Sequence, residues 1–359
     1  MDLAVKHEEA RVNAGNDAGI TVRTLTPEFR QQWDAYVESC PAATFFHLAG
    51  WQEVIEKAFG HRTHYLYAER NGRIAGVLPL GHIRSRLFGN ALISTPFCVY
   101  GGIATEDAAV FAELEVAACA LADSLKVDYL EMRNREARHA AWPRKDLYVT
   151  FRKSIDPDPE KNLLAIPRKQ RAMVRKGIKA GLAGEFDTSV DRFYDAYSQS
   201  VRALGTPVFS KHYFEVLQRV FGESCDILTI THDGDLVSSV MNFYFRDEVL
   251  PYYGGGTPLA RGLKGNDFMY WELMRHSCER GLKVFDYGRS KQGTGSWSFK
   301  KNWGFEPAPL HYEYYLVKAE GVPDISPMNP KYRLFINAWK RLPLPLTRII
   351  GPVLARNLG

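Results

Sequence analysis

The stretch Tyr253-Gly254-Gly255 repeats Tyr100-Gly101-Gly102 from earlier in the chain, and the repetition extends to both sides of it. Three further landmarks recur in the same order: Phe59-Gly60 as Phe221-Gly222, Asn71-Gly72 as Asp233-Gly234, and Asp128-Tyr129 as Asp286-Tyr287. Because the members of each pair are separated by roughly 160 residues, the sequence indicates two copies of one domain rather than an array of short repeats. Such a chain tends to hold its ligand between or beside the copies.

The residues around these landmarks predict the same order of elements in each copy. A helical region, an antiparallel hairpin, a third strand, a long helix and a short buried strand follow one another. Asn-Gly and Asp-Gly favour the positive φ angles that tight hairpin turns require. We expect long helices at Asp107–Leu125 and Asp267–Arg280, and a closing strand of the second copy from Leu310 to Val317. This pattern predicts an α+β fold with two mixed sheets flanked by helices.

Composition restricts the class of protein. The chain has 359 residues, of which 45% are hydrophobic and 24% charged, which is typical of a soluble globular protein with two cores. Its five cysteines are scattered without a Cys-x-x-Cys pair, and no His-x-x-x-His pair occurs. We therefore expect a reducing cytoplasm, no disulfide framework and no metal site.

The domain boundaries are predicted from proline and charge. We expect a flexible N-terminal tail at 1–20, a first domain at 21–160, a second domain at 161–320 and a basic helical tail at 321–359. Asp156-Pro157-Asp158-Pro159 is typical of a stiff linker. Six Lys/Arg, no acidic residue and several large apolar residues make up Ser326–Gly359. That composition suits a membrane surface with anionic lipid and, equally, a helical clasp on the domains.

The first candidate site follows the repeated Tyr-Gly-Gly of the second copy. Glycines let a ligand approach the backbone, and the helix start beyond them offers free N–H groups to an anion. The six candidates for holding a phosphate or carboxylate of a cofactor are Gly254, Gly255, Gly256, Arg261, Lys264 and Gly265. The same spacing also fits a Gly-rich turn with Asn266 or Asp267 as the helix cap.

The second candidate site comes after a buried strand, where polar residues commonly line a cleft. Asp286 or Tyr287 is a candidate to move a proton, and Lys300 or Lys301 to stabilise charge on a tetrahedral intermediate. The alternative is a solvated lysine pair and a carboxylate that caps a helix or forms an ion pair. The expected substrate-binding residues are Tyr100, Tyr253, Arg289, Ser290, Arg171 and Arg175.

The last two of these belong to a basic helix predicted at Arg168–Lys179. Its cations at 168, 171, 175 and 179 share one face. Such a stripe binds nucleic-acid phosphates or an acidic substrate, or is simply a solvated surface.

These motifs together resemble the closing motif of the Fem family, which are tandem-GNAT proteins related to peptidoglycan-bridge aminoacyltransferases. The motif comprises Phe285-Asp286-Tyr287-Gly288, then Ser298-Phe299-Lys300-Lys301-x-Trp303-Gly304-Phe305, then aromatic Tyr312–Tyr315. The basic residues that follow Pro167 are similar as well. The chain most resembles Fem-like proteins associated with PEP-CTERM/exosortase systems of exopolysaccharide-making bacteria, over most of residues 21–359.

The resemblance implies two tandem GNAT-like domains and N-acyl transfer, with the reacting groups in the second copy. The family's assisting lysine falls on Lys300 or Lys301. Acyl-CoA or aminoacyl-tRNA is the implied co-substrate, with no permanently bound cofactor, and the acceptor is an amine of a cell-envelope or exopolysaccharide precursor. The basic helix favours tRNA as a partner, whereas the absence of a long helical arm favours acyl-CoA. The cytoplasm is the expected location, with peripheral contact to the inner membrane through the tail. The alternative class is a non-catalytic binding or scaffold protein of an envelope-polysaccharide system.

Overall fold

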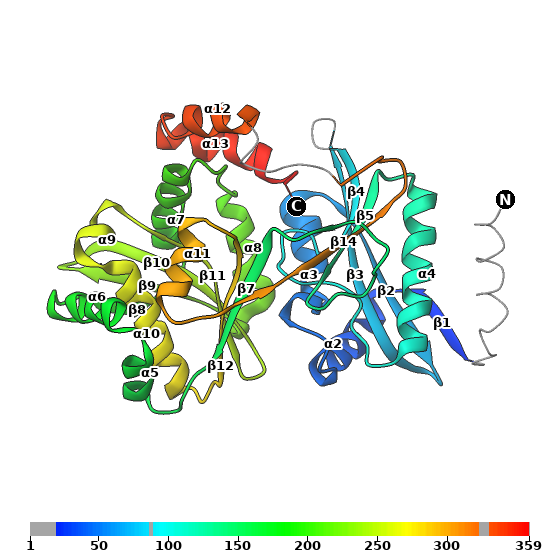
Figure 1. The fold of residues 1–359 in the computed structure, drawn as a ribbon, viewed down its shortest axis with the longest axis horizontal. Coiled ribbons are helices and arrows are strands. Elements are labelled where there is room, and N and C mark those ends of the chain that lie inside the picture. Colours follow the sequence, from blue (N-terminus) through cyan, green and yellow to red (C-terminus); the bar gives the residue numbers. More distant parts are fainter. Residues whose placement is uncertain (1–18, 86–88, 323–329, 359) are drawn as a thin grey trace.

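The computed structural model describes residues 19–85, 89–322 and 330–358, the side chains of 330–334 excepted. The tail predicted at 1–20 lies outside the described residues except for its last two. Two seven-stranded sheets stand side by side with helices around them (Figure 1).

The two sheets have the same design. Sheet A has the order β1 (Ile20–Thr24), β2 (Arg62–Arg70), β3 (Arg73–Ser85), β4 (Gly89–Ser94), β5 (Tyr129–Asn134), β14 (His311–Leu316) and β6 (Arg144–Lys145). Sheet B has the order β8 (Ala183–Phe186), β9 (Cys225–His232), β10 (Asp235–Phe245), β11 (Glu248–Gly256), β12 (Val284–Lys291), β7 (Tyr148–Ser154) and β13 (Pro307–Pro309). The fourth and fifth strands of each sheet pair in parallel, and their other neighbours are antiparallel, so both sheets are mixed as predicted.

Helices cover these sheets and connect their strands. In the first half they are α2 (Arg30–Ser39), α3 (Gly50–Val54) and α4 (Ala108–Leu125), with the short turns η1 (Pro27–Phe29), η2 (Phe45–His47) and η3 (Ile55–Phe59). In the second half they are α5 (Pro159–Ala165), α6 (Arg168–Lys179), α7 (Asp191–Leu204), α8 (Lys211–Phe221), α9 (Pro258–Leu263), α10 (Gly265–Glu279) and α11 (Gly295–Asn302), with η4 (Gly222–Ser224). The last two described helices are α12 (Pro330–Trp339) and α13 (Leu344–Ala355).

The two predicted hairpins are confirmed. Asn71 and Gly72 have φ angles of 52° and 73° between β2 and β3, and Asp233 and Gly234 have 50° and 87° between β9 and β10. Both central residues of each turn are therefore left-handed, as a two-residue turn that matches the twist of the strands requires.

Each sheet takes its sixth strand from the other half of the chain. The strand at 311–316, expected to close the second copy, instead pairs with β5 in sheet A, where Tyr312 lies opposite Arg133. In return, β7 pairs with β12 in sheet B, where Lys153 lies opposite Phe285. The Asp156–Pro159 segment therefore joins two elements that pack on sheet B, and the domain bounds at 160 and 320 stay a prediction.

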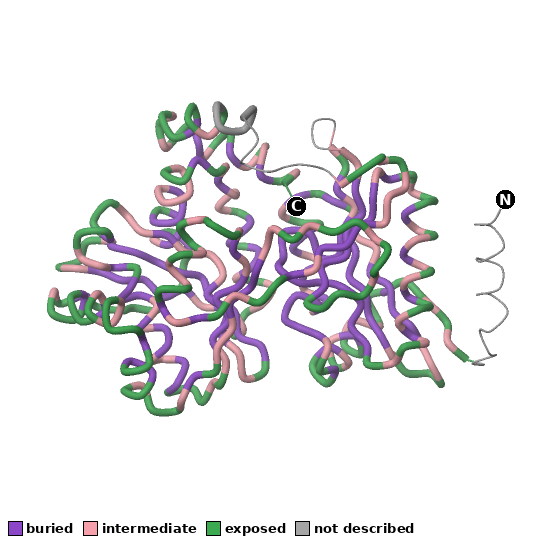
Figure 2. Tube along the Cα trace, viewed as in Figure 1, coloured by how far each residue is buried: buried purple, intermediate pink, exposed green. Residues whose placement is uncertain are grey.

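The two halves also share a hydrophobic core. Phe45 of the first half packs against Phe221 and Phe243 of the second, with ring centroids 4.6 Å apart in both pairs. Buried chain continues from one sheet to the other (Figure 2). Together with the exchanged strands, this core fixes the position of one half relative to the other.

The described part of the C-terminal tail packs as a clasp over both halves (Figure 1). Arg348 of α13 forms an ion pair with Asp195 of α7 at 2.6 Å. Arg356 donates to the carbonyl oxygen of Phe59 in the first half at 2.8 Å. No helix among the described residues combines the length and the apolar character needed to cross a bilayer.

Candidate active site

The parallel strands β11 and β12 are hydrogen-bonded only over a short stretch and then diverge. In this fully described region, two residue pairs join them, Glu248 with Val284 and Val249 with Phe285. β12 then bulges between Asp286 and Gly288, where the pairing register with β7 shifts. Gly288 has a φ angle of 63°, which glycine adopts without the Cβ clash of other residues. The carboxyl ends of the two strands therefore form an open end of the sheet.

A pocket of about 690 Å³ lies where β11 leads into α9 and α10. It is bounded by Gly256 at the end of β11, by Arg261 and Lys264, by Phe299 of α11 and by Met173 of the basic helix α6. Three of the six predicted cofactor residues, Gly256, Arg261 and Lys264, are thus brought together in one pocket.

Of the other three predicted cofactor glycines, Gly255 and Gly265 are required by close packing, whereas Gly254 is not. A Cβ on Gly255 would lie 2.7 Å from the carbonyl oxygen of Ala196 in α7, and one on Gly265 would lie 2.3 Å from Cγ1 of Val237. Gly254 faces Val240 at an ordinary contact distance of 3.4 Å. Gly255 and Gly265 therefore allow α7 and α10 to approach the sheet closely.

Lys264 caps the start of α10 through its backbone, with a φ angle of 62° and no side-chain cap. Asp267, a predicted cap, instead accepts hydrogen bonds from Gln170 of α6 and, at 3.1 Å, from the indole of Trp303. Burial raises the pKa of Asp267, and these two hydrogen bonds lower it in part. The first turn of α10 is thus left facing the pocket beside two cationic side chains.

The two candidate lysines of α11 have different surroundings. The Lys300 ammonium donates to the carbonyl oxygens of Tyr287 at 2.7 Å and of Gly288 and Arg289 at 3.1 Å each. Burial lowers the pKa of Lys300 to about 7, against the opposing effect of Asp286. The Lys301 ammonium instead lies over the Trp297 ring, 4.8 Å from its centroid. Lys300 is therefore the lysine that reaches the bulge of β12.

Asp286 lies on the side of β12 that faces sheet A. Its Oδ1 accepts a hydrogen bond from the Gly288 amide at 2.7 Å, and its Oδ2 accepts one from the Tyr100 hydroxyl at 3.3 Å. Arg152 lies 3.5 Å from the same Oδ2. Burial raises the pKa of Asp286, and Arg152 lowers it in part. The carboxylate is thus part of a buried network that includes Tyr100, a predicted substrate-binding residue.

Tyr287 points to the opposite face. Its ring packs among Tyr270, Phe285 and Phe305, with centroid distances of 4.9, 4.9 and 4.6 Å. Its hydroxyl is buried and has no hydrogen-bond partner among the described residues, and neither has the hydroxyl of Ser290. Asp286 and Tyr287, predicted as alternatives for one role, therefore do not face the same space.

Arg289 lies in an aromatic surrounding. Its guanidinium donates to the Tyr312 hydroxyl at 3.0 Å and lies 4.8 Å from the centroid of the Tyr148 ring. Within the described ranges no carboxylate forms an ion pair with it. Tyr253, in contrast, packs between α7 and α8, where its hydroxyl lies 2.8 Å from that of Tyr213.

The basic stripe of α6 lies on the outer surface. Its cations line a shallow pocket of about 340 Å³ that includes Arg171 and Arg175. The opposite face packs on α10, where a Cβ on Gly177 would lie 2.7 Å from Cβ of Phe268. Because residues two apart lie on nearly opposite sides of a helix, Arg171 and Arg175 point away from Met173 and lie outside the larger pocket.

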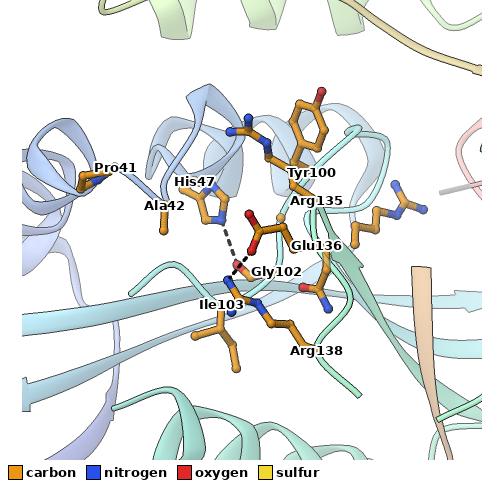
Figure 3. A pocket seen from close by; sticks show the side chains of 12 residues that line it. Pro41, Ala42, His47, Tyr100, Gly102, Ile103, Arg135, Glu136 and Arg138 are labelled. Atoms are coloured by element: carbon orange, nitrogen blue, oxygen red, sulfur yellow. Dashed lines mark hydrogen bonds and ion pairs between the residues drawn. The ribbon is translucent and has the colours of Figure 1, made fainter. Parts of the chain in front are cut away.

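A pocket of about 230 Å³ in the first half was not predicted (Figure 3). It is lined by the repeated Tyr-Gly-Gly and by Arg133, Arg135 and Arg138. Arg135 lies over the Tyr100 ring at 5.5 Å, so this pocket is next to the Asp286 network. Burial lowers the pKa of His47 in its wall to about 4, and its Nε2 lies 2.8 Å from the Gly102 carbonyl oxygen.

Two sequence signals fall in this pocket. Tyr100, a predicted substrate-binding residue, lines it with the rest of its Tyr-Gly-Gly, and Met132-Arg133-Asn134 occupies the place in the first repeat that Gly288-Arg289-Ser290 occupies in the second. Apart from these, a sequence with arginines after a strand cannot be distinguished from that of an ordinary solvent-exposed loop.

Comparisons with known proteins agree with this architecture. Residues 168–301 match the family model of the acetyltransferase (GNAT) domain. No curated protein matches the sequence. The crystal structure of FemX is similar with a TM-score of 0.65 at 16% identity, covering 88% of this chain and 100% of FemX.

Two further solved structures are similar at lower TM-scores. The C-terminal domain of a putative lysylphosphatidylglycerol synthetase from Agrobacterium fabrum has a TM-score of 0.53 at 13% identity, covering 80% of this chain and 91% of its own. A tandem GNAT protein from the clavulanic acid biosynthesis pathway has a TM-score of 0.51 at 14% identity, covering 82% and 97%. At such identities these likenesses concern the fold.

The segment that matches the family model begins at α6 and ends at Lys301, so it contains the larger pocket and the lysine at the β12 bulge. The fold is that of two tandem GNAT-like units, and the second carries a GNAT acetyltransferase domain, which makes this protein an acyltransferase.

Proposed function

We propose that this acyltransferase moves an acyl group from acyl-CoA to an amine at the open end of β11 and β12. The observation that carries the proposal is the position of Lys300, whose ammonium lies at the bulge of β12 and whose pKa is lowered to about 7. The three N–H groups of this ammonium are directed at backbone carbonyls, so it is suited to stabilise an oxyanion through its positive charge and not through a direct hydrogen bond.

The donor would enter through the larger pocket. Arg261, Lys264 and the first turn of α10 offer positive charge and N–H groups to the phosphates of CoA. Phe299 lines the same pocket and is next to Lys300 in α11, so the pocket leads from the phosphate-binding groups towards the reacting centre. Asp267 also lines it, and its two hydrogen bonds reduce its repulsion of the phosphates.

In the reaction we propose, the amine nitrogen attacks the thioester carbonyl carbon, and the carbonyl π electrons move to oxygen. Lys300, with backbone N–H groups near Tyr253–Gly256, stabilises that oxyanion. The C–N bond is then complete, the C–S bond breaks, and the proton lost by the amine goes to the leaving thiolate. We assign Asp286 a positioning role, because its oxygens hold the Gly288 amide and Tyr100.

The pocket of the first half is our candidate for the acceptor. Its arginines and the aromatic Tyr100 suit an acidic group on the molecule that carries the amine. The motif in β12 and α11 resembles that of Fem-like proteins associated with PEP-CTERM/exosortase systems. On this resemblance we propose that the acceptor amine belongs to a cell-envelope or exopolysaccharide precursor and that the reaction takes place in the cytoplasm.

Aminoacyl-tRNA is the second candidate donor. The cations at 168, 171, 175 and 179 along the exposed face of α6 favour it, since such a stripe contacts successive phosphates. Met173 lines the larger pocket from nearly the opposite side of the same helix, so an acceptor stem bound to the stripe would have to pass around α6 to reach that pocket.

Calorimetric titration of the purified chain with acyl-CoAs and with charged tRNA, at two salt concentrations, tests both donors. We expect saturable CoA binding that Arg261→Gln with Lys264→Gln weakens at least tenfold, while Arg171→Gln with Arg175→Gln leaves it unchanged. An affinity for CoA that Arg261→Gln with Lys264→Gln leaves unchanged would overturn the proposed donor site. Preferential binding of charged tRNA, lost in the second pair, would replace acyl-CoA by aminoacyl-tRNA.

A further inference from the structure

Helix α13 has two faces of opposite role. Towards the protein it presents Thr347 and Ala355, which are 0% and 3% exposed, and the buried Gly351 between them. Towards solvent it presents a stripe of four apolar residues: Leu346 at 39%, Ile349 at 71%, Ile350 at 37% and Val353 at 63% exposure. The outward face of a surface helix is normally polar, so this helix has apolar residues where charged ones are expected.

The contacts of α13 hold this stripe outward. A Cβ on Gly351 would lie 2.8 Å from the backbone nitrogen of Val208, so the helix is in direct contact with that loop. Arg348 donates to the Ser198 hydroxyl at 2.8 Å in addition to its ion pair with Asp195. Together with the hydrogen bond from Arg356 to Phe59, these contacts prevent the stripe from rotating into the protein.

Basic side chains stand at the beginning of the stripe. Lys340 and Arg341 are exposed just before α13, whereas the guanidinium of Arg356 just after it is directed at the carbonyl oxygen of Phe59. The whole segment from Ser326 to Gly359 contains no Asp or Glu. An apolar stripe preceded by cations, without acidic residues, is complementary to a bilayer surface that contains anionic lipid.

We propose that the apolar stripe of α13 docks this protein on an anionic membrane surface, with the apolar side chains among the acyl chains and the basic residues at the headgroups. The helix lies along the surface in this arrangement and does not span the bilayer.

Docking would bring the donor pocket to the lipid surface. Arg202 and Leu204 of α7 line that pocket, and the Arg202 guanidinium donates to the carbonyl oxygen of Leu342, just before α13, at 2.8 Å. Leu204 is itself 68% exposed and adds to the apolar surface at this edge. The edge of the donor pocket that Arg202 and Leu204 form would therefore lie near the lipid surface.

Flotation of the full chain with lipid vesicles tests this proposal without any substrate, so its result is independent of the acyl-transfer reaction. We expect binding to phosphatidylcholine vesicles that contain phosphatidylglycerol, weaker binding at high salt, and little binding to phosphatidylcholine alone. Lys340→Gln and Arg341→Gln should each weaken partitioning roughly fivefold, which is the usual contribution of a basic residue near an anionic surface.

Ile349→Asp with Val353→Asp should abolish flotation. The matched control is Val116→Asp, which alters a side chain of equal character on α4, 65% exposed and remote from the tail in Figure 1. Flotation that survives the double substitution, or that Val116→Asp removes equally, overturns the proposal. The oligomeric state provides a second test. If the unaltered chain is a dimer and Ile349→Asp with Val353→Asp converts it to a monomer, the stripe binds a second copy of the chain and the proposal is overturned.

Discussion

The Tyr100 hydroxyl donates a hydrogen bond to Oδ2 of Asp286 at 3.3 Å, and this contact joins the two halves of the protein. Tyr100 belongs to the loop after β4, and Asp286 belongs to β12 at the candidate active site. The same hydroxyl lies 2.6 Å from Oγ1 of Thr150 on the exchanged strand β7. Because all three groups are buried, the network is electrostatically strong and costly to interrupt.

Tyr100→Phe should lower the free energy of unfolding by about 1–3 kcal/mol, because it removes one hydrogen bond to Oδ2 of the buried Asp286 and the contact with the buried Thr150 hydroxyl. Urea denaturation measures the difference. The control is Tyr315→Phe, whose hydroxyl makes an exposed contact with Asp123 and should change stability by less than about 0.5 kcal/mol. Equal effects of the two substitutions would show that the network does not stabilise the fold.

Lys300→Met should reduce kcat by about 10²–10³, the usual effect of removing one group that stabilises an oxyanion. Lys301→Met is the matched control, since its ammonium lies over Trp297 instead of at β12, and we expect kcat to stay within about twofold. Steady-state rates with the acyl donor identified by calorimetry provide the measurement. A greater loss in Lys301→Met would transfer the role to that lysine.

The pKa of Lys300 predicts how stability depends on pH. Its value of about 7 in the folded protein is below the 10.5 of an unperturbed lysine, so the unfolded chain binds the extra proton between these values. Stability from this group therefore rises as pH increases from about 7 to 10.5. We expect the unfolding free energy of the unaltered protein, relative to that of Lys300→Met, to increase as the pH rises over this interval. A difference that stays constant or shrinks would contradict the lowered pKa.

His139 should show the opposite dependence. Burial disfavours its charged form, but the carboxylates of Glu115 and Glu313, 2.9 and 2.8 Å from its ring nitrogens, raise its pKa to about 9. Its contribution is complete below the ordinary value of 6.5 and is lost as pH rises through about 9. The stability difference between the unaltered protein and His139→Gln should therefore fall across that range. Thermal unfolding of both proteins at pH 6 and at pH 9.5 measures this stability difference. A difference that is as large at pH 9.5 as at pH 6 would contradict the raised pKa of His139.

Gly265→Ala should destabilise the protein by about 1–3 kcal/mol, because its Cβ would overlap Val237 at the start of α10. Gly262→Ala in α9 is the matched control. No atom lies within 4 Å of its Cβ position, and alanine favours a helix by roughly 0.5–1 kcal/mol. Denaturation midpoints should therefore move in opposite directions, and movement in the same direction would exclude packing as the reason for Gly265.

Local sequence signals were sufficient for the hairpins and helices but not for the sheet order. The turns at Asn71-Gly72 and Asp233-Gly234 could be predicted because they depend on the φ angles of two residues. β14 could not be assigned to sheet A, since Tyr312 and Tyr314 alternate with less apolar residues in a pattern that suits either sheet. Strand pairing depends on partners far away in the chain.

The candidate site could be predicted by residue type more than by geometry. The motif drew attention to Lys300 and Asp286, and the alternation of side chains along a strand is enough to place Asp286 and Tyr287 on opposite faces. What the sequence did not predict is the bulge of β12 between Asp286 and Gly288, where the carbonyl oxygens that hold Lys300 lie. A bulge leaves little trace in a sequence beyond a glycine such as Gly288. The arginine pocket at Arg135 was missed because charged residues after a strand carry no mark of what they surround.

The reciprocal exchange of β7 and β14 determines when this protein can fold during synthesis. β7 leaves the ribosome long before β12, its partner in sheet B, and sheet A lacks its sixth strand until β14 follows all the strands of sheet B. The nascent first half therefore carries the open edge of β5, a site for wrong pairing, for most of that time. We expect neither half expressed alone to be stable, and we expect chaperones to bind the unfinished chain. Recombining halves from related enzymes would make a foreign strand the sixth strand of each sheet.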